Sequence, residues 1–346
     1  MADPAPATLT VTTHLTPAQQ DDVMALFERA ATLDGHRAVN DAGLLALRSH
    51  PGESASDQPA GESGRHAPLH VLATVNSADG SAAGPTNHLL GYAQAVWESD
   101  GPVAALVVEP DRRRQGIGAA LWQALAQQSP DPLRIWATGN TPAAQALAAF
   151  EGLRPVRTLL VLGRSLDGGL PPTEPPAGIV IRAFRPDRPG DLTGWLRVNS
   201  RAFATHPEQG SMTRADLEQR MAEPWFDPTG FFLAVRTVRT VRTDSSNSDE
   251  VDGEIVGFHW TKREPGATTG EVYVIGVDPT AGIRGLGTPL LGAGLRYLRD
   301  TGATTVDLYV EADNVRALAL YRRYGFTPVT SDVMYATPAA LSEGTG

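Results

Sequence analysis

The chain contains no cysteine, which excludes disulfide bonds, thiolate metal sites and a cysteine nucleophile. Long apolar runs are also missing, because no uninterrupted apolar stretch approaches the roughly 18 residues that span a membrane. Residues 1–6 carry neither the basic nor the apolar segment of an export signal. We therefore expect a cytoplasmic protein that does not insert into a membrane.

A surplus of positive charge is lacking too, since the formal net charge is -10. This disfavours a general nucleic-acid or anionic-membrane binder, although Arg112, Arg113 and Arg114 form a local basic run. We expect a small-molecule substrate, with no nucleic-acid or membrane partner. The length of 346 residues accommodates two domains that each bury a core.

A glycine-centred turn occurs twice in the chain. Each copy follows an apolar run that ends in an acidic residue and a proline, and each precedes a helical pattern. Four landmarks recur in the same order at offsets of 169, 169, 174 and 173 residues: Pro110 and Pro279, Gly116 and Gly285, Asn140 and Asn314, and Gly152 and Gly325. These offsets predict a duplicated domain, and because such a duplication often replaces a homodimer, we expect a monomer.

Composition predicts the boundaries between the copies. A Pro/Gly-rich stretch at 163–178 has no periodicity, so we predict domains at 1–165 and 179–346 joined by a linker at 166–178. Polar stretches at 51–68, 76–86 and 237–253 are typical of surface insertions.

Hydrophobic periodicity predicts a similar order of elements in each half. In the first half, we expect a helix after Thr16, strands at 69–75, 89–97, 103–109, 133–137 and 155–162, and helices at 115–128 and 142–150. In the second half, we expect strands at 179–182, 230–236, 255–262, 270–277, 303–309 and 326–335, with helices near 189–203, 213–222, 285–300 and 314–324. The fold class is therefore α/β, with two tandem domains that each contain a mixed, mostly antiparallel sheet flanked by helices.

The repeated turn is typical of an anion cradle, in which successive backbone N–H groups and a helix N-terminus face a phosphate. A Walker loop requires Lys-Ser/Thr after its last glycine, but Ala119 and Thr288 stand there. A dinucleotide fingerprint requires a small residue where Leu121 and Leu290 stand. The remaining pattern, Arg/Gln-x-x-Gly-x-Gly/Ala between a strand and a helix, resembles that of the GCN5-related N-acetyltransferases (GNAT).

A second motif supports the resemblance. Residues 314–326 match the family's Asn-x-x-Ala-x-x-x-Tyr-x-x-x-Gly-Phe. The resemblance implies acetyl-CoA as co-substrate and no metal. It implies cofactor contacts at Leu106, Val107, Val108, Arg114, Gln115, Gly116, Ile117, Gly118, Ala119, Ile275, Gly276, Val277, Gly282, Ile283, Arg284, Gly285, Leu286, Gly287, Thr288, Asn314, Val315, Arg316, Ala317, Leu318 and Ala319. Gly282 stands where the family usually has Gln or Arg, so we expect weaker binding at the second site.

Acetyl transfer to an amine requires a base, an oxyanion donor and an acid for the departing thiolate. Glu271 lies on a predicted strand and is a candidate base, and Tyr321 is a candidate acid. Backbone N–H groups of residues 275–277 are candidate oxyanion donors, because Gly276 inside a strand suggests a bulge. The alternatives are that Glu271 is a solvated strand-end carboxylate and Tyr321 a core aromatic.

The first half lacks both proton-transfer groups, because Pro102 aligns with Glu271 and Ala148 aligns with Tyr321. We therefore predict that it keeps the cradle, holds cofactor or supports the fold, and does not catalyse transfer.

Further segments point to a substrate. Residues 195–199, 206–210, 225–228, 257–262 and 270–274 resemble a tandem class of the family in actinobacteria that acetylates an amino-sugar thiol, the cysteinyl amine of a cysteinyl-glucosaminyl-inositol. The resemblance implies substrate contacts at Asp41, Glu208, Lys262, Glu271 and Tyr309, with Asp41 one methylene shorter than the usual Glu. Two alternatives remain: an acetyltransferase for another amine (an aminoglycoside, a polyamine or a protein N-terminus), or a non-catalytic acetyl-CoA sensor.

Overall fold

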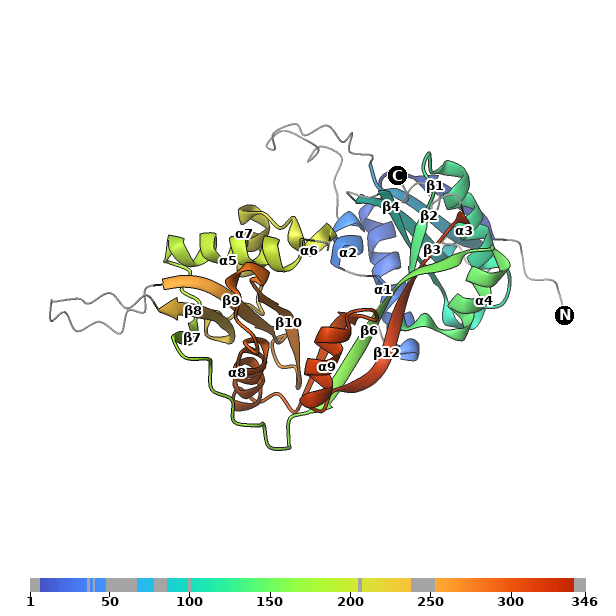
Figure 1. The fold of residues 1–346 in the computed structure, drawn as a ribbon. Coiled ribbons are helices and arrows are strands. Elements are labelled where there is room, and N and C mark those ends of the chain that lie inside the picture. Colours follow the sequence, from blue (N-terminus) through green and yellow to red (C-terminus); the bar gives the residue numbers. More distant parts are fainter. Residues whose placement is uncertain are drawn as a thin grey trace. The chain divides into compact units, whose positions relative to one another are not determined.

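The computed structural model describes residues 7–35, 38–39, 41–47, 67–77, 86–98, 101–204, 207–237 and 253–338. Contacts divide the chain into two units, one of residues 1–159 and 330–346 and the other of residues 160–329. The three polar stretches predicted as insertions lie largely outside the described residues. Figure 1 shows the helices and strands of the two units, coloured along the chain.

Unit 1 contains the elements β1 (Thr8–Thr12), α1 (Pro17–Asp34), α2 (Asp41–Leu47), β2 (Leu69–Ser77), β3 (Thr86–Glu98), β4 (Gly101–Val108), α3 (Ile117–Gln128), β5 (Arg134–Ala137) and α4 (Pro142–Phe150). It also contains most of β12 (Thr327–Ala336). The strand order is β1-β2-β3-β4-β5-β12. Among the described residues, β4 and β5 pair in parallel, at Val103–Arg134 and Ala104–Ile135, and the other neighbours pair antiparallel. The sheet is therefore mixed and mostly antiparallel, as predicted.

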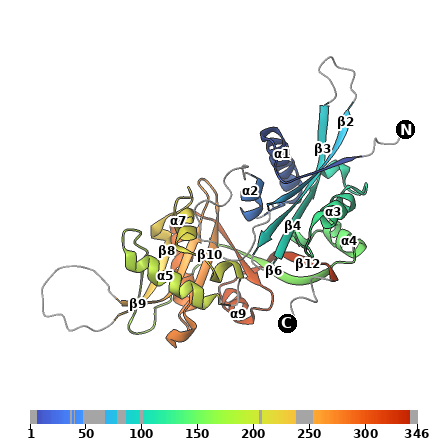
Figure 2. The same cartoon turned by 90° about the horizontal axis from the view of Figure 1, so that it is seen from above.

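The two faces of the unit 1 sheet are buried by different helices. Leu72, Tyr92 and Val107 pack in a core with residues of α1, whereas neighbouring strand residues such as Val71 and Ala93 pack in a core with α3. Figure 2 shows α1 and α3 on either side of β2 and β3. This arrangement follows from strand geometry, because successive side chains point to opposite faces.

Unit 2 contains part of β6 (Arg154–Ser165) and the elements β7 (Ile179–Ala183), α5 (Pro189–Ala202), α6 (Pro207–Gly210), α7 (Arg214–Met221), β8 (Phe231–Thr237), β9 (Gly253–Lys262), β10 (Thr269–Val277), α8 (Gly287–Asp300), β11 (Thr305–Glu311) and α9 (Val315–Arg323). Its strand order is β6-β11-β10-β9-β8-β7. Figure 1 shows α5 and α8 on opposite sides of β8, β9 and β10. The two units thus share one architecture, which agrees with the predicted duplication.

The compact units do not coincide with the halves of the sequence. The last strand of the first half supplies residues 160–165 to unit 2, and the last strand of the second half supplies residues 330–336 to unit 1. In unit 1, Val333 and Tyr335 pair with Ala137 and Ile135 of β5. Domain boundaries at 165 and 179 divide the chain by repeat, whereas contacts divide it by this exchange of final strands.

Most predicted elements are present within a few residues of their expected limits. The sequence patterns missed β1, α2 and α6, which are short: five, seven and four residues. The Thr-Leu-Thr-Val-Thr segment of β1 alternates polar and apolar residues. Most of its residues are exposed at the sheet edge, so it has no buried face that would mark it as a strand. Short elements contain too little periodicity to be distinguished from loops.

Candidate acetyl-transfer site

In each unit, two neighbouring parallel strands separate near their carboxyl ends. β4 pairs with β5 as far as Ala104–Ile135, and β10 pairs with β11 as far as Glu271–Asp307. Residues 106–108 and 275–277 follow these last pairs on β4 and β10. Their backbone groups on that side are not paired with the neighbouring strand, so they are available as hydrogen-bond partners.

Unit 1 has a cavity of about 450 Å³ at this position. The predicted contacts that line it are Leu106, Val107, Val108, Arg114, Gly116, Gly118 and Ala119. Of the other two predicted contacts on this turn, Ile117 is buried in the core and Gln115 is exposed. No sequence pattern indicated the apolar wall of the cavity, which includes Trp122, Trp136, Leu147, Phe150 and Tyr335.

The turn of unit 1 has the backbone geometry that an anion cradle requires. Arg114 and Gly116 both have positive φ, at 64° and 81°, and α3 begins at the next residue, Ile117. The first N–H groups of a helix have no partner within it, so those of α3 are available to a phosphate at this end of the cavity. Arg113, by contrast, is paired with Asp34 at 2.7 Å.

The turn of unit 2 shares one left-handed position with that of unit 1, because Gly285 (φ 78°) corresponds to Gly116. Its other left-handed residue is Gly282 (φ 68°), which aligns with the extended Arg113, and α8 begins at Gly287. The 3-10 turn Pro279–Ala281 precedes them, as Pro110–Arg112 precedes the turn of unit 1. Glycine suits these left-handed positions because it carries no Cβ.

The second helix after each turn, α4 in unit 1 and α9 in unit 2, is capped by a side chain. In unit 2, the Asn314 side chain accepts a hydrogen bond from the Ala317 N–H at 3.1 Å. In unit 1, the equivalent acceptor is Thr141, which caps Ala144 at 3.2 Å. The pairing of Asn140 with Asn314 as repeat landmarks is therefore one residue off, and the Thr141–Asn314 offset of 173 equals that of the following glycines.

The structure corrects the expected bulge. Ile275, Gly276 and Val277 pair regularly with His259, Phe258 and Gly257, and the register shift lies between Val272 and Val274. A Cβ on Gly276 would lie 2.9 Å from the Phe258 ring and 3.1 Å from the Ala202 Cβ. Gly276 thus permits close packing of α5, and the irregularity that the oxyanion hypothesis requires lies at Tyr273.

Several predicted site residues lie on one face of the unit 2 sheet. Glu271 on β10 is paired in register with Lys262 on β9 and with Asp307 on β11, and Tyr309 is two residues beyond Asp307. Intervening residues such as Val272 and Leu308 pack in the core on the other face. Because alternate strand residues share a face, Lys262, Glu271 and Tyr309 project to the side that α5 covers.

Aromatic rings surround the Lys262 ammonium. Its Nζ lies 5.1 Å from the centroid of Trp225 and 5.7 Å from that of Tyr273, and it is 3.4 Å from the Glu264 carboxylate. The Arg220 Nε donates to the Tyr273 hydroxyl at 3.1 Å. These contacts restrict the lysine at a site where it is 14% exposed.

Tyr321 lies on α9 and is 5% exposed. It packs in the core cluster of unit 2, with its ring 5.8 Å from that of Phe326. Burial raises the pKa of the Tyr321 phenol, so the group keeps its proton at neutral pH. The Tyr321 phenol is therefore protonated, as a general acid must be. Its ring packs like that of a core aromatic residue.

Asp307 is paired in register with Glu271, and burial raises the pKa of its carboxyl. No sequence pattern pointed to this residue, because a lone acidic residue on a strand does not indicate a site. The side chains of Asp41 and Glu208 lie outside the described part of the chain. Within the described ranges, no group of three or more His, Asp or Glu residues could hold a metal ion.

The fold and the two cradles define an acetyltransferase class. The model of the acetyltransferase (GNAT) family matches residues 55–151 and 211–326, once in each half. The chain belongs to this family. A GCN5-related N-acetyltransferase from Sphaerobacter thermophilus (TM-score 0.62, 24% identity, 95% of both chains) and a tandem GNAT protein from the clavulanic acid biosynthesis pathway (TM-score 0.63, 18% identity, 96% of this chain and 98% of that chain) share its fold.

Relatives of higher sequence identity carry a more specific name. The chain is 43% identical over 335 residues to the mycothiol acetyltransferase of Streptomyces coelicolor, covering 96% of both proteins. It is 45% identical over 327 residues to that of Thermomonospora curvata, covering 94% of this chain and 95% of the relative. The similarity thus extends over both halves. Within the described residues, no helix is long and apolar enough to cross a membrane.

Proposed function

We propose that this protein transfers the acetyl group of acetyl-CoA to the cysteinyl amine of cysteinyl-glucosaminyl-inositol, giving mycothiol and CoA. The observation that carries the proposal is the grouping of Lys262, Glu271 and Tyr309 on one sheet face, next to the point where β10 and β11 separate. Near-full-length similarity to mycothiol acetyltransferases supports the choice of substrate. A small, hydroxyl-rich ammonium suits a face with carboxylates and a few neutral donors.

The residues of unit 2 fit acetyl-CoA, which supplies the acetyl thioester when bound. Backbone N–H groups of Gly282 to Thr288 and the N-terminus of α8 would hold the pyrophosphate. Strand residues 275–277 would hold the pantetheine amides in the gap between β10 and β11. Residues 314–319, at the start of α9, are the remaining proposed contacts.

The proton transfers are assigned to two side chains. The Glu271 carboxylate accepts a proton from the substrate ammonium, directly or through water, which frees the lone pair that forms the new C–N bond. As the C–S bond breaks, the Tyr321 hydroxyl donates a hydrogen bond and then a proton to the thiolate of CoA. Burial holds the pKa of Tyr321 above its usual value, so the phenol is protonated at the start of each turnover.

In this proposal, unit 1 binds acetyl-CoA without catalysing transfer. Val103, the residue after Pro102, pairs with Arg134 of β5 as Glu271 pairs with Asp307 of β11, so it stands on β4 where Glu271 stands on β10. Ala148 is buried on α4 where Tyr321 stands on α9. Neither side chain has an ionisable group that can transfer a proton. The proposal also includes a monomeric, cytoplasmic enzyme that has neither a nucleic-acid nor a membrane partner.

A substrate panel tests the reaction. The protein is incubated with acetyl-CoA and cysteinyl-glucosaminyl-inositol, an aminoglycoside, a polyamine or a peptide with a free N-terminus. Products are separated by chromatography, because a thiol reagent would also react with the thiol of the proposed substrate. We expect the amino-sugar thiol to have the highest kcat/KM, and a strong preference for any other amine would overturn the assignment.

Glu271→Gln and Tyr321→Phe distinguish an enzyme from an acetyl-CoA sensor. We expect each change to lower kcat about 10²–10⁴-fold, the usual effect of a positioned acid or base. Glu218→Gln on α7 is the matched control, because Glu218 is an exposed carboxylate that forms an i,i+4 ion pair with Arg214. Absence of turnover in the wild type with every amine, together with unchanged CoA binding in both variants, would favour the sensor. Unchanged turnover in both variants would overturn the assignment of Glu271 and Tyr321 as base and acid.

A further inference from the structure

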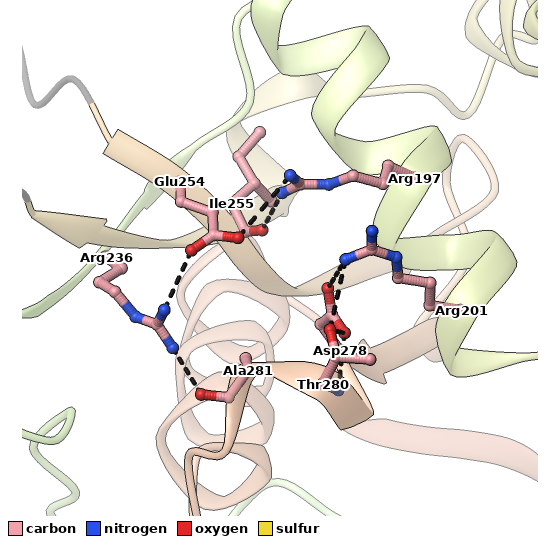
Figure 3. Close-up of polar contacts among 8 residues, drawn as sticks. All are labelled: Arg197, Arg201, Arg236, Glu254, Ile255, Asp278, Thr280 and Ala281. Atoms are coloured by element: carbon pink, nitrogen blue, oxygen red, sulfur yellow. Dashed lines mark hydrogen bonds and ion pairs between the residues drawn. The ribbon is translucent and has the colours of Figure 1, made fainter.

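A network of side chains holds the corner that leads into the unit 2 cradle. The corner comprises Asp278, the 3-10 turn Pro279–Ala281 and Gly282. Figure 3 shows arginines from α5 and β8 directed at the two ends of this corner. None of these side chains belongs to the predicted cofactor contacts.

Asp278 anchors the start of the corner. Its Oδ1 accepts hydrogen bonds from the Thr280 backbone N–H at 2.8 Å and hydroxyl at 2.6 Å, and its Oδ2 accepts one from Arg201 at 3.0 Å. The side chain of Asp278 is 1% exposed. Burial alone would raise the pKa of this carboxyl, but the bonds from Thr280 and Arg201 outweigh burial and lower it. A buried, ionised carboxylate with three donors is a rigid anchor.

Arg236 holds the other end of the corner. Its Nη2 donates to the Ala281 carbonyl at 2.5 Å, and its Nη1 donates to Glu254 at 3.0 Å. Arg236 and Glu254 are direct partners in the pairing of β8 with β9. The hydrogen bond to Glu254 on the neighbouring strand therefore restricts the Arg236 side chain, which extends from the sheet to the turn (Figure 3).

The bond to Ala281 has a consequence for the next residue. A trans peptide unit is planar, with its C=O and N–H directed oppositely. Because Arg236 fixes the direction of the Ala281 carbonyl, it also fixes the direction of the Gly282 N–H, which points away from Arg236. Gly282 is the first left-handed residue of the turn, and its N–H is the first of the proposed backbone donors.

Unit 1 contains a related ion pair. Arg29 on α1 contacts Glu109, the acidic residue before Pro110, at 2.7 Å. Arg201 on α5 contacts Asp278, the acidic residue before Pro279. The partners are 80 residues apart in unit 1 and 77 in unit 2, so the ion pair recurs with the duplication. A contact retained in both copies of a diverged repeat points to the feature that both retain, the cradle.

We propose that Arg201 and Arg236 are positioning residues that fix the corner so that the Gly282 N–H faces the pyrophosphate of acetyl-CoA. The inference rests on the proposed function, because it assigns a role within the same cofactor site. It also explains how a cradle with glycine at 282, and hence no side-chain donor there, keeps its first backbone donor oriented.

Steady-state kinetics of Arg236→Gln test the proposal, with whichever amine the wild type accepts best. We expect the KM for acetyl-CoA to rise about tenfold, the usual effect of losing one charge-assisted hydrogen bond. The kcat and the KM for the amine should stay within about twofold, since no reacting group is touched. Arg236→Lys should recover part of the loss, because one donor remains.

Arg214→Gln is the control, because it removes an exposed ion pair from the same unit. If Arg236→Gln does not fold, Thr280→Ala, which removes a donor to Asp278, replaces it with the same expected rise in KM. An unchanged KM for acetyl-CoA in the folded variant would overturn the proposal, as would an equal change in Arg214→Gln.

A calorimetric titration with CoA separates this proposal from the proposed function, because it needs no amine. We expect one class of site to weaken about tenfold in Arg236→Gln, and an isotherm identical to that of the wild type would overturn the inference. If the wild type binds CoA but acetylates none of the amines, the proposed function fails while the role of Arg236 is still decided.

Discussion

At the scale of single residues, His259 shows how buried polar groups constrain this chain. It is fully buried between β9 and α8, and its Nδ1–H donates to the Leu290 carbonyl at 2.8 Å. A Cβ on Gly294 would lie 2.1 Å from the His259 ring, so glycine is required where α8 passes over it. Burial lowers the pKa of His259 to about 4, and the imidazole is neutral at pH 7.

This pKa predicts a pH dependence of stability. In the unfolded chain a histidine binds a proton near pH 6.5, whereas folded His259 does so only near pH 4, so the unfolded state binds more protons between these values. The stability that neutral His259 contributes is present above pH 6.5 and is lost as the pH falls toward 4, by roughly 3 kcal/mol. Urea unfolding at pH 7.5, 6 and 5 measures the change.

The control is His259→Gln, which cannot titrate. Its free energy of unfolding should vary less with pH than that of the wild type. His70 in unit 1, with its pKa also lowered to about 4 by burial, adds a slope of the same sign in both proteins. Equal slopes for wild type and variant would show that His259 does not titrate as expected.

At the scale of elements, local signals placed most helices and strands, and packing decided the details. Thr16 and Thr213 begin α1 and α7 with capping boxes, which the sequence alone can indicate. The role of Gly276 could not be read in this way, because a glycine in a strand fits either a bulge or a close contact. Only the position of α5 shows that it serves the contact.

Gly276→Ala tests that explanation. The added methyl group would meet Phe258 and Ala202 at about 3 Å, so α5 must shift, and we expect a loss of about 1–3 kcal/mol in the free energy of unfolding. Gly190→Ala on α5 is the control, because a Cβ at Gly190 meets nothing within 4 Å. Similar melting curves for the two variants would contradict the packing explanation.

The cap of α9 gives a second prediction at this scale. Asn314→Ala removes the acceptor for the Ala317 N–H, and we expect it to cost about 1 kcal/mol. Asn314→Asp keeps an oxygen acceptor and should retain most of the stability. Denaturant unfolding compares the three proteins, and an equal loss in both variants would mean that the side chain does more than cap the helix.

At the scale of the whole molecule, the exchange of final strands separates sequence position from structural position. Met334 lies near the end of the second half, yet it is 3% exposed and pairs with Trp136 of β5 in unit 1. Tyr335, its neighbour, lines the unit 1 cavity and donates to Asn140 at 2.9 Å. The cofactor-like cavity of the first half is thus completed by the last strand of the second.

Met334→Ala should therefore destabilise unit 1. We expect a loss of about 2–5 kcal/mol, the usual cost of truncating a buried methionine. Amide hydrogen exchange should accelerate in β4 and β5 more than in β9 and β10, although the substituted residue follows β10 in the chain. Loss of protection confined to β9 and β10 would contradict the exchange of strands.

The sequence by itself determined the duplication, the two cradles, the family and the candidate catalytic pair, because each depends on short patterns whose geometry is local. It did not determine that Lys262, Glu271 and Tyr309 share a face, since pairing between separate strands decides that. Nor did it show the arginines that hold the Asp278 corner or the exchange of final strands. These depend on contacts between residues far apart in the chain, which only the tertiary structure brings together.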